Sequence, residues 1–365
     1  MRLIDLNYYA FNKTDPVLFG LIISLIITGL VVLTSANQID MSHTVSQIMN
    51  IVVGIGLLYL VCYIKTRFIL ISAPWVYLVS ILLLLLVDIV GIESHGSQRW
   101  IDLGIFNLQP SETLKISLPL MLAWLYQKFN KKVGYQTHFI ASILVLIPSF
   151  LVFIQPDLGT SLLIMWAGIV IIFLAGLPIK ILIACIASFL ISLPFIWGSL
   201  LQYQKNRVLN LIDPFNDPLG AGYHSIQSMI AVGSGGLIGR GWGNGTQTRL
   251  DFLPETTTDF IFAVFSEEFG FIGVLGIMVL FIIIFIRCMW MASKMQDTFS
   301  RLLSAGLTIS LFTSLIVNIG MISGLLPIVG VPLPFISYGG TSMVVSLVSM
   351  GIIMNLYLNK SLIAN

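Results

Sequence analysis

Asp259 is the acidic residue whose position is best suited to chemistry. It stands in Thr256-Thr257-Thr258-Asp259-Phe260-Ile261-Phe262, where a long apolar run begins. A carboxylate there can cap the helix, because Asp satisfies free N–H groups and suits the helix dipole at an N-terminus. It can instead act as a general base, because partial desolvation raises the pKa of a carboxyl toward the working range. The residues alone leave both roles open.

Glu112 and Lys115 form a second candidate pair. They are three residues apart at the start of another apolar run, a spacing that places them on one helix face, where they can pair. Charges within a membrane are costly, so each needs a reason. The pair either orients two helices or lines a polar cavity. The preceding Gln109-Pro110-Ser111 is typical of a helix start, with Pro in the first turn and Ser as a candidate cap.

Other acidic residues have plainer interpretations. Asp157, in Gln155-Pro156-Asp157-Leu158-Gly159-Thr160-Ser161, is predicted mainly to cap the helix that follows. Glu267 and Glu268 lie two turns beyond Asp259, and we expect polar contacts with a neighbouring helix. Asp88 is isolated within an apolar run, and the sequence offers it no partner.

Cations near polar loops are candidates for binding an anion. Arg99 and Trp100 can anchor an interface through an aromatic belt and a snorkelling cation, or they can bind an anionic lipid head group. Lys205 and Arg207 precede Asp213-Pro214, and Arg is well suited to bidentate phosphate binding. A solvated face without a ligand remains the alternative.

The glycine-rich run 233–239 is not a nucleotide loop, because the chain has no G-K-[ST] and no predicted strand before the run. We interpret it as a tight or re-entrant turn. Without a nucleotide, a bond-forming reaction must draw its driving force from the substrate, and a pyrophosphate-linked lipid donor would fit. The four His are scattered and the three Cys form no C-x-x-C pair, so neither a His-based metal site, a zinc site nor a disulfide framework is predicted.

These residues must be positioned by membrane helices. Of the 365 residues, 57% are hydrophobic and 9% are charged, against roughly 25% charged residues in a soluble domain. The composition excludes a soluble enzyme, a disordered chain and a nucleic-acid binder. We predict an all-α, polytopic membrane protein with ten spans. The expected spans are 17–36, 47–64, 69–91, 112–127, 138–154, 158–177, 179–200, 260–286, 303–326 and 337–358.

The charge distribution predicts the orientation of these spans. With a cytoplasmic N-terminus, most Lys and Arg residues fall in short cytoplasmic segments, as the positive-inside rule requires. The even number of spans then places the C-terminus in the cytoplasm too. Residues 201–258 become one large extracytoplasmic loop between spans 7 and 8, within a single domain over 1–365. Long loops in compact proteins are usually functional, so we expect the chemistry to be extracytoplasmic.

Several ordered motifs resemble the SEDS family (shape, elongation, division and sporulation), and the segment 326–334 resembles its rod-elongation branch. One departure is Thr256-Thr257, where the family often has a His. The matching motifs are Gly96-Ser97-Gln98-Arg99-Trp100-Ile101, Gln109-Pro110-Ser111-Glu112 with Lys115, Gln155-Pro156-Asp157-Leu158-Gly159-Thr160-Ser161, Asp213-Pro214 with Asp217-Pro218-Leu219-Gly220, Tyr223-His224-Ser225-Ile226-Gln227-Ser228, Phe252-Leu253-Pro254-Glu255, Thr258-Asp259-Phe260-Ile261-Phe262-Ala263, Glu267-Glu268 and Ile336-Ser337-Tyr338-Gly339-Gly340-Thr341-Ser342.

The resemblance implies a peptidoglycan glycosyltransferase of the bacterial cytoplasmic membrane, which polymerises lipid II into glycan strands on the outer face during elongation. Undecaprenyl pyrophosphate would be the leaving group. The implied partners are a class B penicillin-binding protein and other membrane proteins of the elongation complex. No cofactor is certain, and a divalent cation (Mg²⁺ or Mn²⁺) is a candidate.

The resemblance also assigns site residues. The essential acidic residue of the family falls on Asp259, which favours the general base, and Glu112 with Lys115 matches its central-cavity pair. Two other functions stay open: a lipid II flippase with Glu112–Lys115 as a proton relay, and a non-catalytic scaffold with Asp259 as a helix cap. Further site-lining candidates are Arg99, Trp100, Gln109, Ser111, Asp157, Thr160, Arg207, His224 and Ser228.

Overall fold

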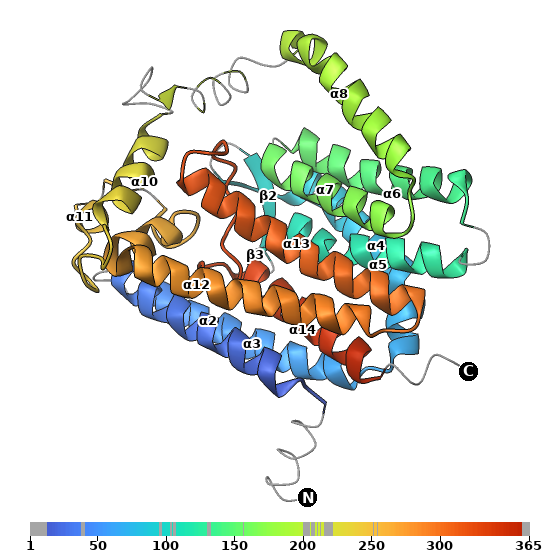
Figure 1. The fold of residues 1–365 in the computed structure, drawn as a ribbon, viewed down its shortest axis with the longest axis horizontal. Helices are drawn as coiled ribbons and strands as arrows, with labels where there is room; N and C mark the ends of the chain where they lie inside the picture. Colours follow the sequence, from blue (N-terminus) through green and yellow to red (C-terminus); the bar gives the residue numbers. More distant parts are fainter. Residues whose placement is uncertain are drawn as a thin grey trace, which may run out of the picture.

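The computed structural model describes residues 13–37, 41–94, 97–102, 104, 107–129, 133–155, 157–199, 205, 209, 211, 213–214, 222–250, 252–253 and 255–359. Helices dominate these residues, as predicted (Figure 1). The helices are α2 (Pro16–Ala36), α3 (Ser42–Tyr63), α4 (Thr66–Val90), α5 (Pro110–Lys128), α6 (Tyr135–Ile154), α7 (Leu158–Leu174), α8 (Ile179–Ser199), α10 (Tyr223–Ser234), α11 (Thr246–Arg249), α12 (Ile261–Ser293), α13 (Thr298–Ile322) and α14 (Gly340–Leu358).

Every predicted span coincides with one of these helices. Seven of them, α2, α3, α4, α6, α12, α13 and α14, are long and apolar enough to cross a membrane. α7 has 17 residues, slightly fewer than the ~20 of a typical span. α5 carries Glu112, Lys115 and Lys128, and most of its residues are buried among other helices. The chain is therefore a multi-pass membrane protein.

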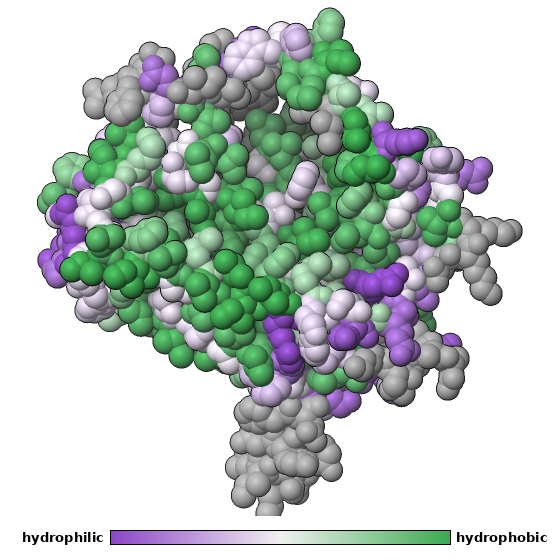
Figure 2. All heavy atoms as spheres, in the orientation of Figure 1, coloured by the Kyte–Doolittle hydropathy of each residue, from purple (hydrophilic) through white to green (hydrophobic). Residues whose placement is uncertain are grey.

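The surface supports this assignment. Large apolar side chains, including Trp75, Phe139 and Ile272, point outward from the helices. Figure 2 shows apolar residues across the face of the bundle, with hydrophilic residues gathered toward its edges. An exposed apolar surface of this extent is unfavourable in water and favourable in lipid.

α5 lies at the centre of the bundle and packs against α4, α6, α7, α13 and α14. Its charged pair is therefore surrounded by protein rather than by lipid. α3 packs along α14, and α6 along α7. α8 leans away from the other helices at the top of Figure 1.

A small antiparallel sheet follows α4 and was not predicted. It consists of β1 (Ile92–Ser94), β2 (Ser97–Asp102) and β3 (Asn107–Leu108), in the order β1-β2-β3. The loop 92–111 was predicted only as a polar connection, because strands this short carry too little alternation to stand out. Successive side chains of a strand point to opposite faces, so β2 directs Arg99 and Trp100 to different sides.

α12 is two helices joined at Gly270, whose φ is +64°. A helix without this break would bond the N–H groups of residues 271 and 272 to the carbonyls of residues 267 and 268. Here those N–H groups bind the carbonyls of Gly236 and Leu237 instead. The carbonyls of Glu267 and Glu268 accept from the N–H groups of residues 240 and 241. The glycine-rich run is thus a turn, as predicted, and it completes the hydrogen bonding of the broken helix.

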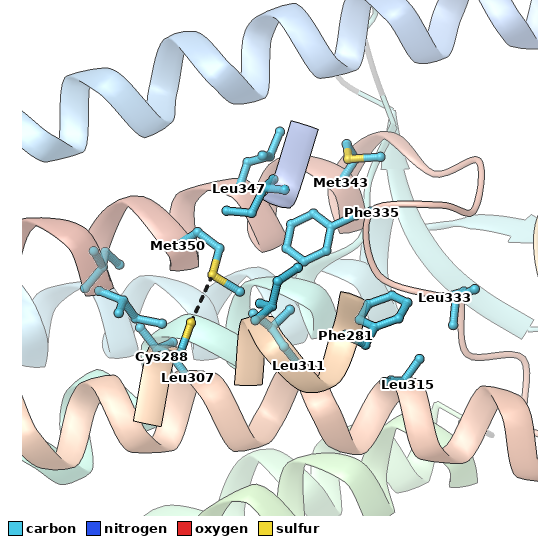
Figure 3. Packing of buried hydrophobic residues seen from close by; sticks show 14 of the residues in the cluster. Phe281, Cys288, Leu307, Leu311, Leu315, Leu333, Phe335, Met343, Leu347 and Met350 are labelled. Carbon is cyan, nitrogen blue, oxygen red and sulfur yellow. Dashed lines mark hydrogen bonds between the residues drawn. The ribbon is translucent and has the colours of Figure 1, made fainter. Parts of the chain in front are cut away.

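The segment between α13 and α14 is anchored in the apolar core. Leu333 and Phe335 are buried and lie beside Phe281, Leu311 and Leu315 from α12 and α13 (Figure 3). The dashed line in Figure 3 joins the sulfur atoms of Cys288 and Met350, which are 3.8 Å apart. Cys62 and Cys288 are buried free thiols.

Candidate active site

Asp259 lies in a turn immediately before α12, one residue ahead of the N-cap position occupied by Phe260. Three consecutive carbonyls in this turn accept hydrogen bonds from distant residues. The carbonyl of Thr257 accepts from the Tyr338 N–H at 2.9 Å, and that of Thr258 from the Ser337 hydroxyl at 2.7 Å. The carbonyl of Asp259 accepts from Nδ2 of Asn318 at 2.9 Å. The backbone that carries the carboxylate is therefore fixed.

Each of the two segments joined by these hydrogen bonds contains one residue with a strained backbone. Glu255 has a φ of +50° and Phe335 a φ of +65°, and residues with side chains rarely adopt such values. Conformations of this kind persist where the surrounding structure holds them, and they cluster at functional sites. Both residues lie within a few positions of the hydrogen bonds that hold Asp259.

Gly330 lies directly beside the carboxylate. Its φ is +69°, and a Cβ built on it would come within 3.2 Å of Asp259 Oδ2. The preceding residue, Val329, packs against Gly159 on α7 so closely that a Cβ at residue 159 would overlap its atoms. The 329–330 segment therefore connects Asp259 with the N-terminus of α7.

Asp157 caps α7, as predicted. Its Oδ1 accepts from the Thr160 N–H at 3.2 Å, and its Oδ2 accepts from the Thr160 hydroxyl at 2.9 Å. Arg99 Nη1 of β2 lies 3.7 Å from Asp157 Oδ2. The structure thus brings Arg99, from one sequence motif, together with Asp157 and Thr160 from another.

The Glu112–Lys115 pair forms as predicted. Lys115 Nζ lies 2.6 Å from Glu112 Oε1, and 10% and 4% of the two side chains are exposed. The N-cap residue of α5 is Gln109 and Pro110 occupies the first turn, so Ser111 is not the cap. Ser111 is instead buried.

Gln109 and Trp100 lie near the same end of α5. The Gln109 N–H lies 3.4 Å from the hydroxyl of Thr341, which in turn donates to the Asn107 carbonyl at 3.0 Å. Trp100 is half-buried and pairs across the sheet with Ile92. These contacts link the sheet and α14 to the start of α5.

His224 and Ser228 lie on α10 and have different surroundings. The ring of His224 lies 6.4 Å from that of Phe260, next to Asp259. Partial desolvation lowers the pKa of His224, and the negative charge of Glu255 acts in the opposite direction. Ser228 is fully buried, and its hydroxyl donates to the carbonyls of Ser225 and Ile322. Ser228 thus joins α10 to the end of α13. Arg207 lies outside the described residues.

Glu267 and Glu268 bind the segment 233–250, and Glu268 also binds the neighbouring helix α2. The sequence predicted contacts with a neighbouring helix only. Oε1 of Glu267 accepts from the Thr246 N–H at 2.8 Å and from the Gln247 N–H at 3.2 Å. Oε1 of Glu268 accepts from the Ser35 hydroxyl of α2 and from the Gly243 N–H. Both glutamates are buried, so they hold the 233–250 segment on α12.

Sequence reasoning missed Asn318, and it left Asp88 without a partner. Asn318 is a buried amide within an otherwise apolar stretch of α13, which is the signal that could have indicated it. Asp88, near the end of α4, accepts from Gln155 Nε2 at 2.9 Å. Among the described residues, no three His, Cys, Asp or Glu side chains gather in a group that could hold a metal ion.

Comparisons with known proteins identify the family of the chain. A family model described as "Cell cycle protein", covering FtsW, RodA and SpoVE, matches residues 16–362. The peptidoglycan glycosyltransferase MrdB of Escherichia coli is 42% identical, over 96% of this chain and 95% of MrdB.

Two solved structures share the fold. A chain from work on "structural coordination of polymerization and crosslinking by a peptidoglycan synthase complex" gives a TM-score of 0.85 at 29% identity, over 96% of this chain and 99% of that one. The rod shape determining protein RodA of Thermus thermophilus gives 0.73 at 26% identity, over 95% of this chain and 97% of RodA. This chain belongs to the FtsW/RodA/SpoVE family, the SEDS proteins.

Proposed function

We propose that this chain is a peptidoglycan glycosyltransferase that joins lipid II into glycan strands at the outer face of the bacterial cytoplasmic membrane during elongation. The fixed position of Asp259 is the observation that supports this most directly. Its backbone is held by Asn318, Ser337 and Tyr338, and its carboxylate lies beside Gly330. Family membership and the name of the 42% identical relative support the same activity.

Asp259 acts as the general base in this mechanism. Its carboxylate accepts the proton of the 4-hydroxyl of the acceptor sugar while that oxygen attacks the anomeric carbon of the donor. The new carbon–oxygen bond forms as the bond from the anomeric carbon to undecaprenyl pyrophosphate breaks. The donor is α-linked and the product β-linked, so one displacement with inversion suffices.

The leaving group carries two phosphates and needs cations. Arg99 is the better placed of the two described candidates, since 27% of its side chain is exposed and its carboxylate partner is 3.7 Å away. Lys115 is more buried and its partner is closer, at 2.6 Å. We therefore assign Arg99 to the pyrophosphate and the Glu112–Lys115 pair to the wall of the proposed substrate site.

The remaining site residues support these groups. Asp157 accepts from Thr160 at the N-terminus of α7 and pairs with Arg99. Gln109 and Ser111 form the start of α5, and Trp100 lies on the neighbouring strand β2. The ring of His224 lies 6.4 Å from that of Phe260, the residue after Asp259, and Ser228 fixes α10. We propose Arg207 as a second cation for the pyrophosphate. None of the described residues is assigned to a divalent cation.

The orientation in the membrane follows from the same function. We propose ten spans with both termini in the cytoplasm, so that the loop 201–258 and Asp259 face the periplasmic or outer side. The structural relative from a synthase complex that couples polymerization and crosslinking supports a class B penicillin-binding protein as the partner. Other membrane proteins of the elongation complex would join them.

A polymerisation assay tests the function. Purified protein, with and without its cognate penicillin-binding protein, is given labelled lipid II, and the products are separated on a gel. We expect Asp259→Asn to lower the rate at least ~100-fold, since a general base contributes about 10²–10⁴. Asp297→Asn is the matched control, because Asp297 caps the far end of α13 through the Ser300 N–H.

Each alternative has its own signature. A ladder of products from Asp259→Asn would contradict the base assignment. Movement of labelled lipid II across vesicles without elongation would favour a flippase with the Glu112–Lys115 pair as its relay. Function of Asp259→Asn in cells, together with no polymerisation by the wild type, would favour a scaffold.

A further inference from the structure

Asn318 makes two hydrogen bonds that join the active-site turn to the segment between α13 and α14. It lies on α13 and is fully buried. Its Nδ2 donates to the carbonyl of Asp259 at 2.9 Å and to the carbonyl of Val331 at 2.7 Å. Both hydrogens of the amide are thereby used. One side chain thus ties the turn before α12 to the segment that contains Gly330.

A buried asparagine at position 318 costs free energy of folding relative to an apolar residue. Burying an amide costs free energy unless it is hydrogen-bonded. The Oδ1 atom of Asn318 is buried and finds no hydrogen-bond donor within the described part of the chain, so the side chain keeps an unsatisfied acceptor. An apolar residue would avoid that cost. The amide is explained by the two carbonyls that it holds together.

Ser337 makes a parallel connection one residue earlier in the turn. Its hydroxyl donates to the Thr258 carbonyl at 2.7 Å and accepts from the Leu333 N–H at 2.8 Å. Gln47 of α3 in turn binds the Ser337 carbonyl at 3.0 Å and the Gly339 N–H at 3.2 Å. Gln47 of α3 therefore fixes the segment 337–339, and Ser337 in that segment fixes the turn that carries Asp259.

We infer that Asn318 and Ser337 are positioning residues for Asp259, holding its carboxylate beside Gly330 at the place where the acceptor hydroxyl is deprotonated. The inference rests on the proposed function. A base must lie within hydrogen-bond reach of the proton that it accepts, and a displacement of about 1 Å can cost ~10²-fold in rate. Neither residue touches the reacting atoms; both act through the backbone of Asp259.

The test compares two buried asparagines. Asn318→Leu keeps the approximate size and removes both bonds to the turn. Asn355→Leu is the matched control, because Asn355 is equally buried and its Nδ2 donates to the carbonyls of Val61, Cys62 and Ile64, at the end of α3. Lipid II polymerisation is measured per folded molecule, with the thermal unfolding midpoint recorded for each variant.

We expect Asn318→Leu to lower kcat about 10- to 100-fold while KM for lipid II changes less than about threefold, since transition-state interactions are lost and ground-state binding is kept. The acidic limb of the pH–rate profile should also shift, because it reports the essential base. Asn355→Leu should lower the unfolding midpoint and leave both kcat and the pH profile unchanged. Ser337→Ala, a smaller change that serves if Asn318→Leu does not fold, should lower kcat in the same way.

The possible outcomes distinguish the positioning role of Asn318 and Ser337 from the proposed role of Asp259 as the general base. If Asp259→Asn is inactive while folded Asn318→Leu or Ser337→Ala keeps the wild-type kcat and pH profile, the positioning role is wrong and the base assignment stands. If Asn355→Leu loses kcat to the same extent, the effect is one of general stability and the inference is again overturned. If Asp259→Asn is itself active, the proposed function fails first.

Discussion

Lys115 Nζ lies 2.6 Å from Glu112 Oε1, one helical turn away on the central helix α5. The second carboxylate oxygen of Glu112 is buried and has no hydrogen-bond partner among the residues that the structure describes. A buried acceptor of this kind can receive a hydrogen bond from a substrate hydroxyl. The pair is thus a structural unit of α5, and we propose that this second oxygen accepts a hydrogen bond from the substrate.

Separating the two roles requires a double substitution. Lys115→Met leaves the buried Glu112 carboxylate uncompensated and should cost about 3–5 kcal/mol. Adding Glu112→Gln removes the lone charge and should restore most of the unfolding midpoint. We expect the double variant to remain about 5- to 10-fold slower in lipid II polymerisation, because Gln keeps an acceptor but replaces a hydrogen bond to a charged group, about 1.5–3 kcal/mol, by a neutral one of about 0.5–1.5 kcal/mol. A double variant with the wild-type rate would show that the pair only joins helices.

Arg99 should bind the leaving group through its forked guanidinium. Arg99→Lys keeps the charge and loses the bidentate geometry, so KM for lipid II should rise about tenfold, equivalent to ~1.4 kcal/mol. The unfolding midpoint should change little, since the ion pair with Asp157 is 3.7 Å long and partly exposed. Arg301→Lys, an exposed change on α13, is the control. Equal KM values for the two variants would exclude Arg99 from the binding of the pyrophosphate.

Much of the fold could be predicted because a membrane span needs a long apolar run. Each predicted run became a helix, with ends shifted by a few residues, as for α3, which begins at Ser42 rather than near residue 47. The sheet of β1, β2 and β3 could not be predicted, since two- to six-residue strands carry too little pattern. The break in α12 was also missed, because its cause is the hydrogen bonding of a distant loop.

Local spacing predicted the contacts made within one element. The i,i+3 separation gave the Glu112–Lys115 pair, and the position before an apolar run gave the Asp157 cap. Contacts between elements could not be read in this way. Asn318 and Asp259 are 59 residues apart, and nothing in either local pattern shows that the side chain of the first meets the backbone of the second.

Gly270 should be one of the least replaceable residues of α12. Its φ is +64°, and a Cβ there would come within 2.2 Å of the Gly239 nitrogen. Gly270→Ala should therefore lower stability by more than the ~1–3 kcal/mol of backbone strain alone, and thermal unfolding in detergent would measure the loss. Gly276→Ala is the matched control, since a Cβ at that helical position meets nothing within 4 Å, and we expect it to be neutral or stabilising. Equal midpoints for the two variants would contradict the break described here.

Glu267 should determine how firmly the 233–250 segment is held. Its Oε1 accepts from the Thr246 N–H and hydroxyl, from the Gln247 N–H and from the Ser234 hydroxyl. Glu267→Ala removes the acceptor of two partly buried N–H groups, at a cost of up to about 1 kcal/mol each, so amide hydrogen exchange across 240–250 should accelerate. Glu267→Gln keeps a carbonyl acceptor and loses the charge, so its exchange should fall between Glu267→Ala and the wild type. Unchanged exchange in Glu267→Ala would show that the turn packed into the break at Gly270 holds the segment without the carboxylate.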